Sequence, residues 1–428
     1  MYQLSTLDKL MPPVYVPVVW SYAADEAAAE PRWSEETVPA LRDSFEATVR
    51  EFFPIFNHPV RHDEKSGMIL ATNDDALPAL FQVGERVTEA AVPEAGTPAG
   101  EWRPPRSSYA PHDPENDAIG AEHGERSLLV RVTPVSNGVC VLASFHHSVV
   151  DAGSMVAFMM AWSAVAEEGL EAARDKIEVV MEPSLLQGEA DAAPSSTPRT
   201  CRNLIPMPYM TTRDLDAWAS TLPEPALLRK RFTRAALEAT REAGRTAGFV
   251  PTSHEMVCAE VMREAAKYQA QDMPFSLQFP ANLRGRYRNL PDAYFGSAVV
   301  LCVTEPMPAG SVAKADVAVL APMIRAAKER WTSSAEVDAV LGWEVARDVR
   351  PRHFPESDGA HMVLTNWTSF PFFAVTLTLG TPVHVAPAYT MWVPNLGHIL
   401  ATAPSTDRAA DVIFCLPEPV QANSETAP

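Results

Sequence analysis

The chain of 428 residues is 46% hydrophobic and 21% charged, so it is long enough to bury a large core and to form two domains. Its formal net charge of −19 argues against a nucleic-acid or anionic-membrane partner, because phosphates would be repelled at long range.

The cysteines and the chain start carry information about compartment. The five cysteines form no CxxC pair, which favours a reduced compartment and argues against a zinc site; they are Cys140, Cys201, Cys258, Cys302 and Cys415. The first thirty residues lack a basic start followed by an apolar run, and no stretch reaches ~18 consecutive apolar residues. We therefore expect a cytoplasmic protein with neither a signal peptide nor a membrane span.

The first half of the chain begins with a helix and continues into a long irregular segment. An amphipathic helix is predicted from Ala40 to Phe53, with apolar residues at helical spacing: Leu41, Phe45, Val49 and Phe52. The segment from Pro93 to Ser127 is rich in proline and acidic residues, which predicts a surface excursion at the rim of a binding site.

A base and a carboxylate stand where a predicted strand gives way to a helix. Two strands are expected, at Leu128–Val132 and Val139–Phe145, joined by a hairpin turn at Ser136-Asn137-Gly138. A helix is expected from Ser154, and His147 and Asp151 fall between the second strand and this helix. Strand ends of this kind commonly present side chains to a cleft.

His147 has the chemistry of a general base. An imidazole has an ordinary pKa near 6.5, so at neutral pH it can accept a proton from a hydroxyl or an amine. Asp151 can form an ion pair with an arginine or cap the following helix. The competing interpretation is a histidine that only ends a strand and an aspartate that is only a helix cap.

Domain boundaries are predicted from composition. Residues 187–208 begin with the small, polar, proline-containing stretch Gln187 to Thr200, which indicates an interdomain linker. The domains would span residues 1–186 and 209–428, with a frayed tail after Leu416.

The second half contains two candidate anion-binding segments. The basic cluster Arg229, Lys230 and Arg231 could meet phosphates, although such a run is more often a solvated face. Thr252 and Ser253 open a predicted helix with a capping box, and a helix start can either hold a phosphate or be an ordinary cap. An aromatic stretch ending at Trp392 is predicted to be core or pocket wall.

Four motifs together resemble the BAHD superfamily of acyl-CoA-dependent acyltransferases, in particular its fungal, trichothecene-acetyltransferase-like branch. HHxxxDG of that family is matched by His146 to Gly153, with Ala152 before the glycine. The other matches, in chain order, are Leu4 to Pro12, Glu51 to Val60, and Ala281 to Arg286 followed by Tyr294 to Val300. The resemblance covers nearly the whole chain in order and spacing.

The resemblance implies an α/β fold of two similar-sized domains. Each has a mixed sheet flanked by helices, as in chloramphenicol acetyltransferase, and the active site lies at the domain interface. It also implies acyl-CoA as cosubstrate, a small-molecule acceptor, no tightly bound cofactor or metal, and a monomer.

The resemblance also implies roles for individual residues. Thr365 would donate to the tetrahedral intermediate, and Trp367 would form a wall of the acceptor pocket, with His146, Gly153 and Trp392 as further substrate contacts. A half-buried strand is the plain alternative for Thr365 and Trp367. CoA would lie beside Thr252 or Ser253 and near the cluster of Arg229, Lys230 and Arg231.

One motif of the family is missing. Its DFGWG segment falls on Thr376 to Gly380, of which only the glycine is retained. In relatives the aspartate of that segment is thought to pair with an arginine of the RxR stretch, so here Arg284 or Arg286 needs another anion or must face water.

The sequence therefore predicts transfer of an acyl group, expected to be acetyl, from acyl-CoA to a hydroxyl or amine of a secondary metabolite. His147 would be the general base, and no acyl-enzyme would form. Alternatives are a CoA-independent condensation or cyclisation on the same scaffold, a carrier-bound donor, and a non-catalytic binder. GxSxG, GxGxxG and GxxxxGK[ST] are all absent.

Overall fold

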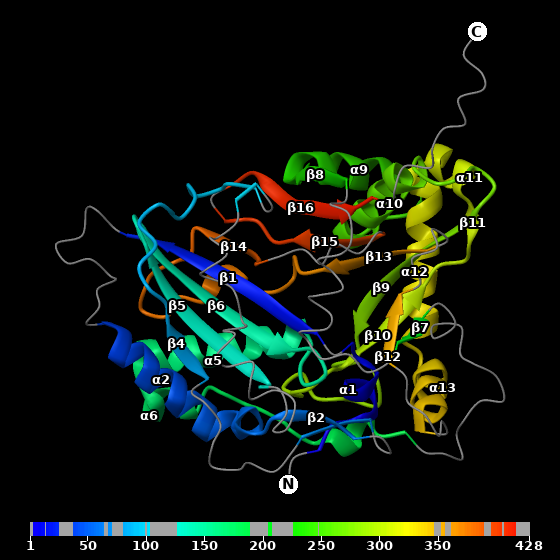
Figure 1. The fold of residues 1–428 in the computed structure, drawn as a ribbon. Coiled ribbons are helices and arrows are strands. Elements are labelled where there is room, and N and C mark those ends of the chain that lie inside the picture. Colours follow the sequence, from blue (N-terminus) through cyan, green and yellow to red (C-terminus); the bar gives the residue numbers. More distant parts are fainter. Residues whose placement is uncertain are drawn as a thin grey trace.

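The structure is a computed structural model of the chain, and Figure 1 shows its ribbon. It describes residues 3–12, 14–24, 37–63, 67–70, 80–98, 101–102, 126–188, 204–207, 226–246, 248–345, 352–355, 361–388, 395–404 and 406–416. The aromatic stretch with Trp392 and most of the predicted linker and proline-rich excursion lie outside these residues.

The first sheet has five strands in the order β14-β1-β6-β5-β4. They are β1 (Tyr15–Ala23), β4 (Phe81–Val83), β5 (Leu128–Val135), β6 (Gly138–His146) and β14 (His384–Pro387). Only β4 and β5 pair in parallel, so the sheet is mixed. β14 comes from the far end of the chain and pairs with β1, with Val18 opposite Pro387 (Figure 1).

Helices pack against one side of this sheet: α2 (Thr37–Phe52), α5 (Ala152–Glu168) and α6 (Leu170–Arg174) (Figure 1). The predicted amphipathic helix is confirmed as α2, which buries Leu41, Phe45 and Val49. The Phe158 ring of α5 lies 5.2 to 5.9 Å, centroid to centroid, from the rings of Phe45, Phe53, Phe56 and Phe145. Edge-to-face packing of this kind makes α5 the centre of the first core.

The hairpin before His147 is confirmed and slightly tighter than predicted. Val135 pairs with Gly138, so the turn consists of Ser136 and Asn137 alone. Gly138 already lies in β6 beside β1, where a Cβ atom would come within 2.1 Å of the Tyr22 carbonyl oxygen. A glycine is therefore required there by close approach of two backbones.

The second sheet has seven strands, of which six follow the order β10-β9-β13-β15-β16-β8 and β11 pairs with β9. They are β8 (Leu227–Thr233), β9 (Pro274–Asn282), β10 (Val299–Val303), β11 (Met307–Pro308), β13 (His361–Asn366), β15 (Leu396–Leu400) and β16 (Arg408–Cys415). β13 is parallel to both β9 and β15, whereas the other pairs are antiparallel.

Helices α10 (Ser253–Ala266) and α12 (Val317–Trp331) bury their apolar faces against this sheet. Further α-helices in the described part of this half are α9 (Arg234–Thr246), α11 (Ala309–Lys314) and α13 (Ser334–Val345). The fold class is confirmed, because two mixed sheets are each flanked by helices (Figure 1).

Short elements complete the described chain. They are the helices α1 (Thr6–Leu10), η1 (Pro54–Asn57), η3 (Pro183–Leu186) and η5 (Phe372–Ala374), and the strand pairs β2 (Val60–Asp63) with β3 (Gly67–Leu70) and β7 (Leu204–Met207) with β12 (Arg352–Pro355). β7 falls inside the predicted linker, and the domain boundaries stay predictions.

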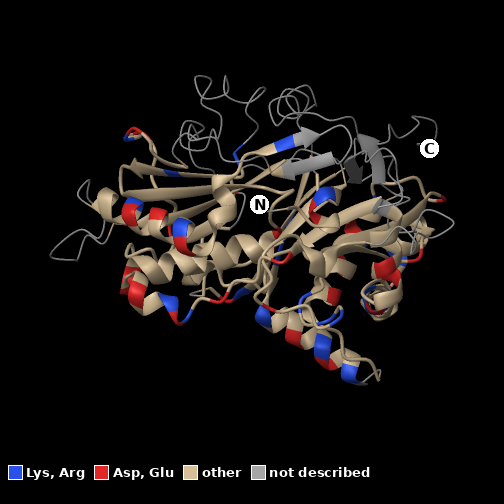
Figure 2. Ribbon diagram, turned by 90° about the horizontal axis from the view of Figure 1, so that it is seen from below, with Lys and Arg blue, Asp and Glu red and all other residues tan. Residues whose placement is uncertain are grey.

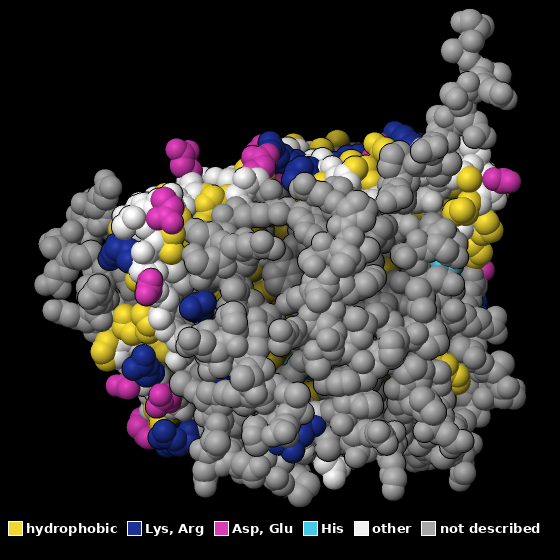
Figure 3. Space-filling view, viewed as in Figure 1, with side chains coloured by type: hydrophobic (Ala, Val, Ile, Leu, Met, Phe, Trp, Pro, Cys, Tyr) yellow, Lys and Arg dark blue, Asp and Glu magenta, His cyan; other side chains and the backbone are white. Residues whose placement is uncertain are grey.

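Acidic and basic residues both occur along the helices of the ribbon in Figure 2. Among the described residues on the face drawn in Figure 3, charged groups of both signs are scattered among apolar and neutral ones. On α9, for example, Arg241 pairs with Glu238 and Arg245 with Glu242. Within the described ranges, no helix is both long and apolar enough to cross a membrane.

Candidate functional site

His147 lies in the turn between β6 and α5, and its ring is held in one tautomer. The backbone N–H of His147 donates to the Val14 carbonyl at 2.8 Å, which fixes the turn against the start of β1. The ring Nδ1 lies 3.1 Å from the Val150 carbonyl oxygen. Because a carbonyl can only accept, Nδ1 carries the proton and Nε2 keeps a free lone pair.

The surroundings keep this imidazole neutral. Burial lowers the pKa of His147, and this outweighs the hydrogen bond to Val150 and the charge of Asp151, which act in the opposite direction. At neutral pH the side chain is therefore an uncharged base with its lone pair on Nε2. The predicted chemistry of His147 is compatible with this geometry.

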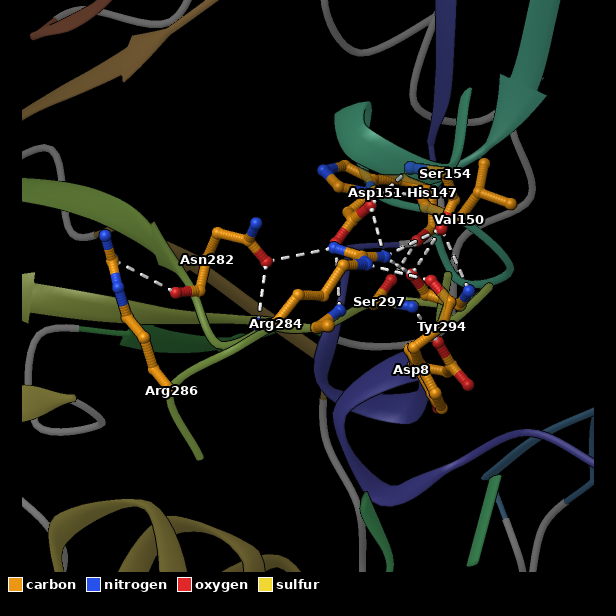
Figure 4. Close-up of polar contacts among 12 residues, drawn as sticks. Asp8, His147, Val150, Asp151, Ser154, Asn282, Arg284, Arg286, Tyr294 and Ser297 are labelled. Carbon is orange, nitrogen blue, oxygen red and sulfur yellow. Dashed lines mark hydrogen bonds and ion pairs between the residues drawn. The ribbon is translucent and has the colours of Figure 1, made fainter. Parts of the chain in front are cut away.

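Asp151 forms a buried ion pair with Arg284, shown in Figure 4. The guanidinium donates from Nη1 to Oδ2 at 2.8 Å and from Nη2 to Oδ1 at 3.1 Å. The backbone N–H groups of Ser154 and Ala298 donate to Oδ1 and Oδ2 at 2.8 and 2.9 Å. Asp151 is thus both a helix cap and an ion-pair partner, the two jobs that the sequence left open.

These contacts decide the charge of Asp151. Burial raises its pKa, but Arg284 and the backbone donors outweigh burial and hold the pKa below its ordinary value. Both carboxylate oxygens are occupied by these donors, so the ionised side chain supports the turn that carries His147.

Arg284 has no unused donor group that requires an outside anion. Its Nε donates to the Tyr294 carbonyl at 2.8 Å, and Nη2 also donates to the Ser154 hydroxyl and the Gly296 carbonyl. Gly153 leaves space for this guanidinium, because a Cβ atom there would lie 3.2 Å from Nη1. The anion that Arg284 was expected to need is therefore Asp151.

The segment that replaces DFGWG docks elsewhere. The hydroxyls of Thr376 and Ser163 are 2.9 Å apart, and the backbone N–H groups of Thr376 and Leu377 donate to the same Ser163 oxygen. Ser163 belongs to α5, so the segment is fastened to the helix of the first core and does not contribute a partner to Arg284.

A cavity of about 600 Å³ lies beside His147, at the junction of the two sheets. Its lining includes Tyr15 and Pro17 of the first sheet, and Ala281 and Thr365 of the second. Such a volume suits a small-molecule site.

The end of β13 divides this cavity into two sides. Successive strand residues point to opposite faces of a sheet. Leu364 belongs to the core under α10, and Asn366 bonds to His254 of α10, so these residues face the helix side. Val363 and Thr365 point to the opposite side, where His398 of β15 is paired with Thr365 in register. We call these the helix side and the open side of the cavity.

On the helix side, His254 is held by Asn366. The Asn366 carbonyl oxygen accepts from the backbone N–H and the hydroxyl of Thr368 at 2.8 and 2.7 Å. The amide nitrogen therefore faces His254 Nδ1 at 3.0 Å, which makes Nδ1 an acceptor and leaves the ring proton on Nε2. Burial, with a further contribution from Lys328, lowers the pKa of His254 to about 4.

Two cations line the cavity near His254. Arg286 extends away from Arg284 (Figure 4), and Lys328 lies on α12. Burial and the charge of Arg286 lower the pKa of Lys328. In the part of the chain that the structure describes, neither cation forms an ion pair with a carboxylate, so the two charges are available to an anion.

The predicted site residues fall into three groups. Those that line the cavity are His147, Asp151, Gly153, Thr365 and Trp367. His146 is fully buried against the Tyr15 ring, and Thr252 and Ser253 are engaged as the helix cap of α10 and as the acceptor of an Arg241 hydrogen bond. Trp392 lies outside the described residues.

The predicted basic cluster does not reach the cavity lining. Arg229, Lys230 and Arg231 lie on β8. Lys230 pairs with Glu260 at 3.0 Å, and Arg231 pairs with Glu101.

Polar cavity residues that were not singled out for the site from the sequence include His254, Arg286, Lys328, Asn366 and His398. For Asn366, the alternation of faces along a strand was an available signal, because its neighbour Thr365 was already a candidate. The others are brought together by tertiary packing. The described residues contain no group of three or more His, Cys, Asp or Glu side chains that could hold a metal ion.

Replacing Asp151 by asparagine should lower the free energy of unfolding by ~3–5 kcal/mol, because it leaves the Arg284 guanidinium buried without its counter-charge. Urea unfolding at neutral pH measures this change. The matched control is Glu168→Gln, which breaks an exposed pair with Lys176 and should cost ~1 kcal/mol or less. Equal losses in the two variants would contradict a structural role for the Asp151 ion pair.

Comparison with solved structures reveals the same fold at low identity. TRI101 of F. sporotrichioides, complexed with coenzyme A and T-2, is 14% identical with a TM-score of 0.73 over 97% of this chain and 95% of that chain. TRI101 of F. graminearum, complexed with coenzyme A and T-2 mycotoxin, is 13% identical with a TM-score of 0.70 over the same shares. Vinorine synthase is 16% identical with a TM-score of 0.65, over 97% and 90%.

Sequence comparison gives the family. No curated protein sequence matches the chain. The model of the Transferase family, however, matches residues 1–421. This match extends from before α1 to beyond β16, so it includes both sheets and the cavity between them. The chain belongs to this family, the BAHD superfamily of acyl-CoA-dependent acyltransferases.

Proposed function

We propose that the protein transfers an acyl group, with acetyl as the expected case, from acyl-CoA to a hydroxyl or amine of a small secondary metabolite. The observation that carries this proposal is the tautomer of His147, whose unprotonated Nε2 belongs to a neutral ring at the cavity. Family membership supports the reaction class. The coenzyme A complexes of TRI101 support the choice of donor.

The proposed reaction needs one base and no acyl-enzyme. Nε2 of His147 takes the proton from the acceptor while the acceptor oxygen or nitrogen attacks the thioester carbonyl carbon. The Thr365 hydroxyl, which lines the cavity, donates to the oxyanion of the tetrahedral intermediate. When the C–S bond breaks, protonated His147 returns the proton to the CoA thiolate, so the imidazole ends neutral.

Acyl-CoA is assigned to the helix side of the cavity. Arg286 and Lys328 line this side and have no carboxylate partner among the described residues, and CoA phosphates are the anions that the proposed reaction supplies. The residues predicted from the sequence to bind CoA remain candidates; they are Arg229, Lys230, Arg231, Thr252 and Ser253. Lys230 and Arg231 are already paired with glutamates, so Arg286 and Lys328 are the preferred candidates for binding the CoA phosphates.

The acceptor is assigned to the open side, next to Thr365 and Trp367. Trp367 is almost fully buried, and its ring packs 5.6 Å from that of Phe372, centroid to centroid. An indole held in this way forms a rigid apolar wall for a hydrophobic acceptor. His146 and Trp392 remain predicted contacts, and the cytoplasmic location and monomeric state remain predictions.

His147→Ala should lower turnover by roughly 10²–10⁴-fold, the usual contribution of a general base, while CoA affinity stays within about twofold of the wild type. Release of the CoA thiol measures turnover, and calorimetric titration measures CoA affinity. A variant that keeps near wild-type turnover would rule out His147 as the base. The control His384→Ala removes a buried histidine that is not in the cavity lining and should retain activity.

The pH dependence of kcat/KM should report the lowered pKa of His147. The neutral ring is the active form, so activity is lost as pH falls through the folded-state pKa, and burial holds that pKa below 6.5. We expect activity to decline towards acidic pH with a midpoint below pH 6.5, and to change little between pH 7.5 and 8. A midpoint at or above 6.5 would contradict this environment for the imidazole.

Calorimetric titration with CoA distinguishes the two sets of cations. Arg286→Ala and Lys328→Ala should each weaken binding about tenfold or more, since a hydrogen bond to a charged group contributes ~1.5 kcal/mol or more. Lys230→Ala should leave binding unchanged, because its ammonium group is paired with Glu260. If Lys230→Ala weakened CoA binding more than Arg286→Ala or Lys328→Ala, the basic cluster on β8 would be the better candidate for binding the CoA phosphates. Wild-type protein that binds neither CoA nor acyl-CoA would favour a carrier-bound donor, condensation or cyclisation.

A further inference from the structure

Three histidines line the cavity, and His398 is the one whose ring is not held by a hydrogen bond. Nδ1 of His147 donates to Val150, and Nδ1 of His254 accepts from Asn366. For His398, Nδ1 is buried and has no hydrogen-bond partner among the residues that the structure describes. Throughout the described chain, no hydrogen bond to its Nε2 is found either.

The position of His398 is nevertheless well defined. It lies in the middle of β15, opposite Thr365 of β13, and its ring meets that of Trp367 edge-on at 5.3 Å between centroids. It therefore belongs to the open side of the cavity, next to the proposed oxyanion donor and the indole wall. A side chain packed in this way presents its ring nitrogens in a fixed direction.

The imidazole ring of His398 is uncharged and has apolar neighbours. Burial lowers the pKa of His398 to about 4, so at neutral pH the imidazole offers hydrogen bonds and no charge. Its neighbours in the lining of the open side include Val363, Trp367 and Leu396. A buried polar group without a partner is unfavourable, so a ligand that supplies the missing hydrogen bond is favoured there.

We infer that His398 is a specificity-determining residue that hydrogen-bonds a second polar group of the acceptor, distinct from the hydroxyl or amine that is acylated. The acceptor class is then a largely apolar small molecule with one further hydroxyl or carbonyl. Either tautomer serves this role, because the ring donates to a carbonyl or accepts from a hydroxyl. The inference rests on the proposed function, since it needs an acceptor on the open side.

The test uses matched bicyclohexyl alcohols that carry one hydroxyl, two hydroxyls at opposite ends, or a hydroxyl and a ketone at opposite ends. Their dissociation constants are measured by calorimetry on CoA-saturated protein, and acetyl-CoA turnover is measured in parallel. Wild-type protein should bind the diol or the hydroxyketone about tenfold more tightly than the mono-alcohol, because only these complete the bond to His398.

Two substitutions of His398 separate hydrogen bonding from packing. His398→Phe keeps an aromatic ring against Trp367 and should abolish the preference without changing CoA affinity. His398→Gln keeps a hydrogen-bonding group and should restore part of the preference. His384→Phe is the control, because His384 is also a buried neutral histidine and neither of its ring nitrogens has a hydrogen-bond partner in the described ranges. It packs on Trp102, outside the cavity lining.

The outcomes are distinct. Loss of the preference in His398→Phe alone supports the inference. A wild-type protein that binds CoA but does not prefer the second polar group, or a His398→Phe variant that keeps the preference, overturns it and leaves the proposed function standing. Wild-type protein that fails to bind CoA overturns the proposed function together with this inference.

Discussion

The ion pair between Asp151 and Arg284 is the contact on which the geometry of the cavity depends. It joins the turn after β6 to the loop after β9, and therefore the first sheet to the second. Burial of two charges is unfavourable unless their remaining hydrogen-bonding capacity is satisfied. Here the backbone of Ser154, Ala298, Tyr294 and Gly296 satisfies it, so three chain segments meet at the pair: residues 151–154, the loop with Arg284, and residues 294–298.

This arrangement explains how an aspartate four residues from a base can be essential without contacting the reacting atoms. Asp151 caps α5 and holds the turn in which the Val150 carbonyl fixes the tautomer of His147. The base is thus aligned by the backbone, and the backbone is aligned by the carboxylate. Asp151 therefore acts on the reaction only through the position of His147: His147 provides the chemistry, and Asp151 stabilises the turn that holds it.

Sequence analysis predicted the local features well, because hairpin, strand and helix signals lie within a few residues of one another. β5, β6, α5 and the position of His147 between them follow from such signals. The partner of Arg284 could not be predicted, because the contact with Asp151 connects residues 133 positions apart. The missing aspartate at Thr376 drew attention to Arg284 or Arg286, without deciding between them, and left the anion unknown.

The cations illustrate a second limit. Arg229, Lys230 and Arg231 are conspicuous because they are consecutive, yet consecutive strand residues alternate between the two faces and cannot all meet one ligand. Lys328 is unremarkable in the sequence, and Arg286 was noted only as a possible partner of a missing aspartate. The two cations approach each other only when α12 packs beside β10. Convergence of charge in a cavity is a property of tertiary structure, and the lone ring of His398 beside Thr365 has the same origin.

The pairing of β14 with β1 has a consequence for movement and assembly. β14, from the second half of the chain, is a strand of the sheet that the first half forms. The two halves are therefore joined by backbone hydrogen bonds between β14 and β1. Wide opening about a hinge between the halves would have to break these bonds or bend the segments on either side of β14. Small molecules that reach His147 are therefore expected to pass through openings at the ends of the cavity, and an isolated first half would expose the unpaired edge of β1 as a site for aggregation.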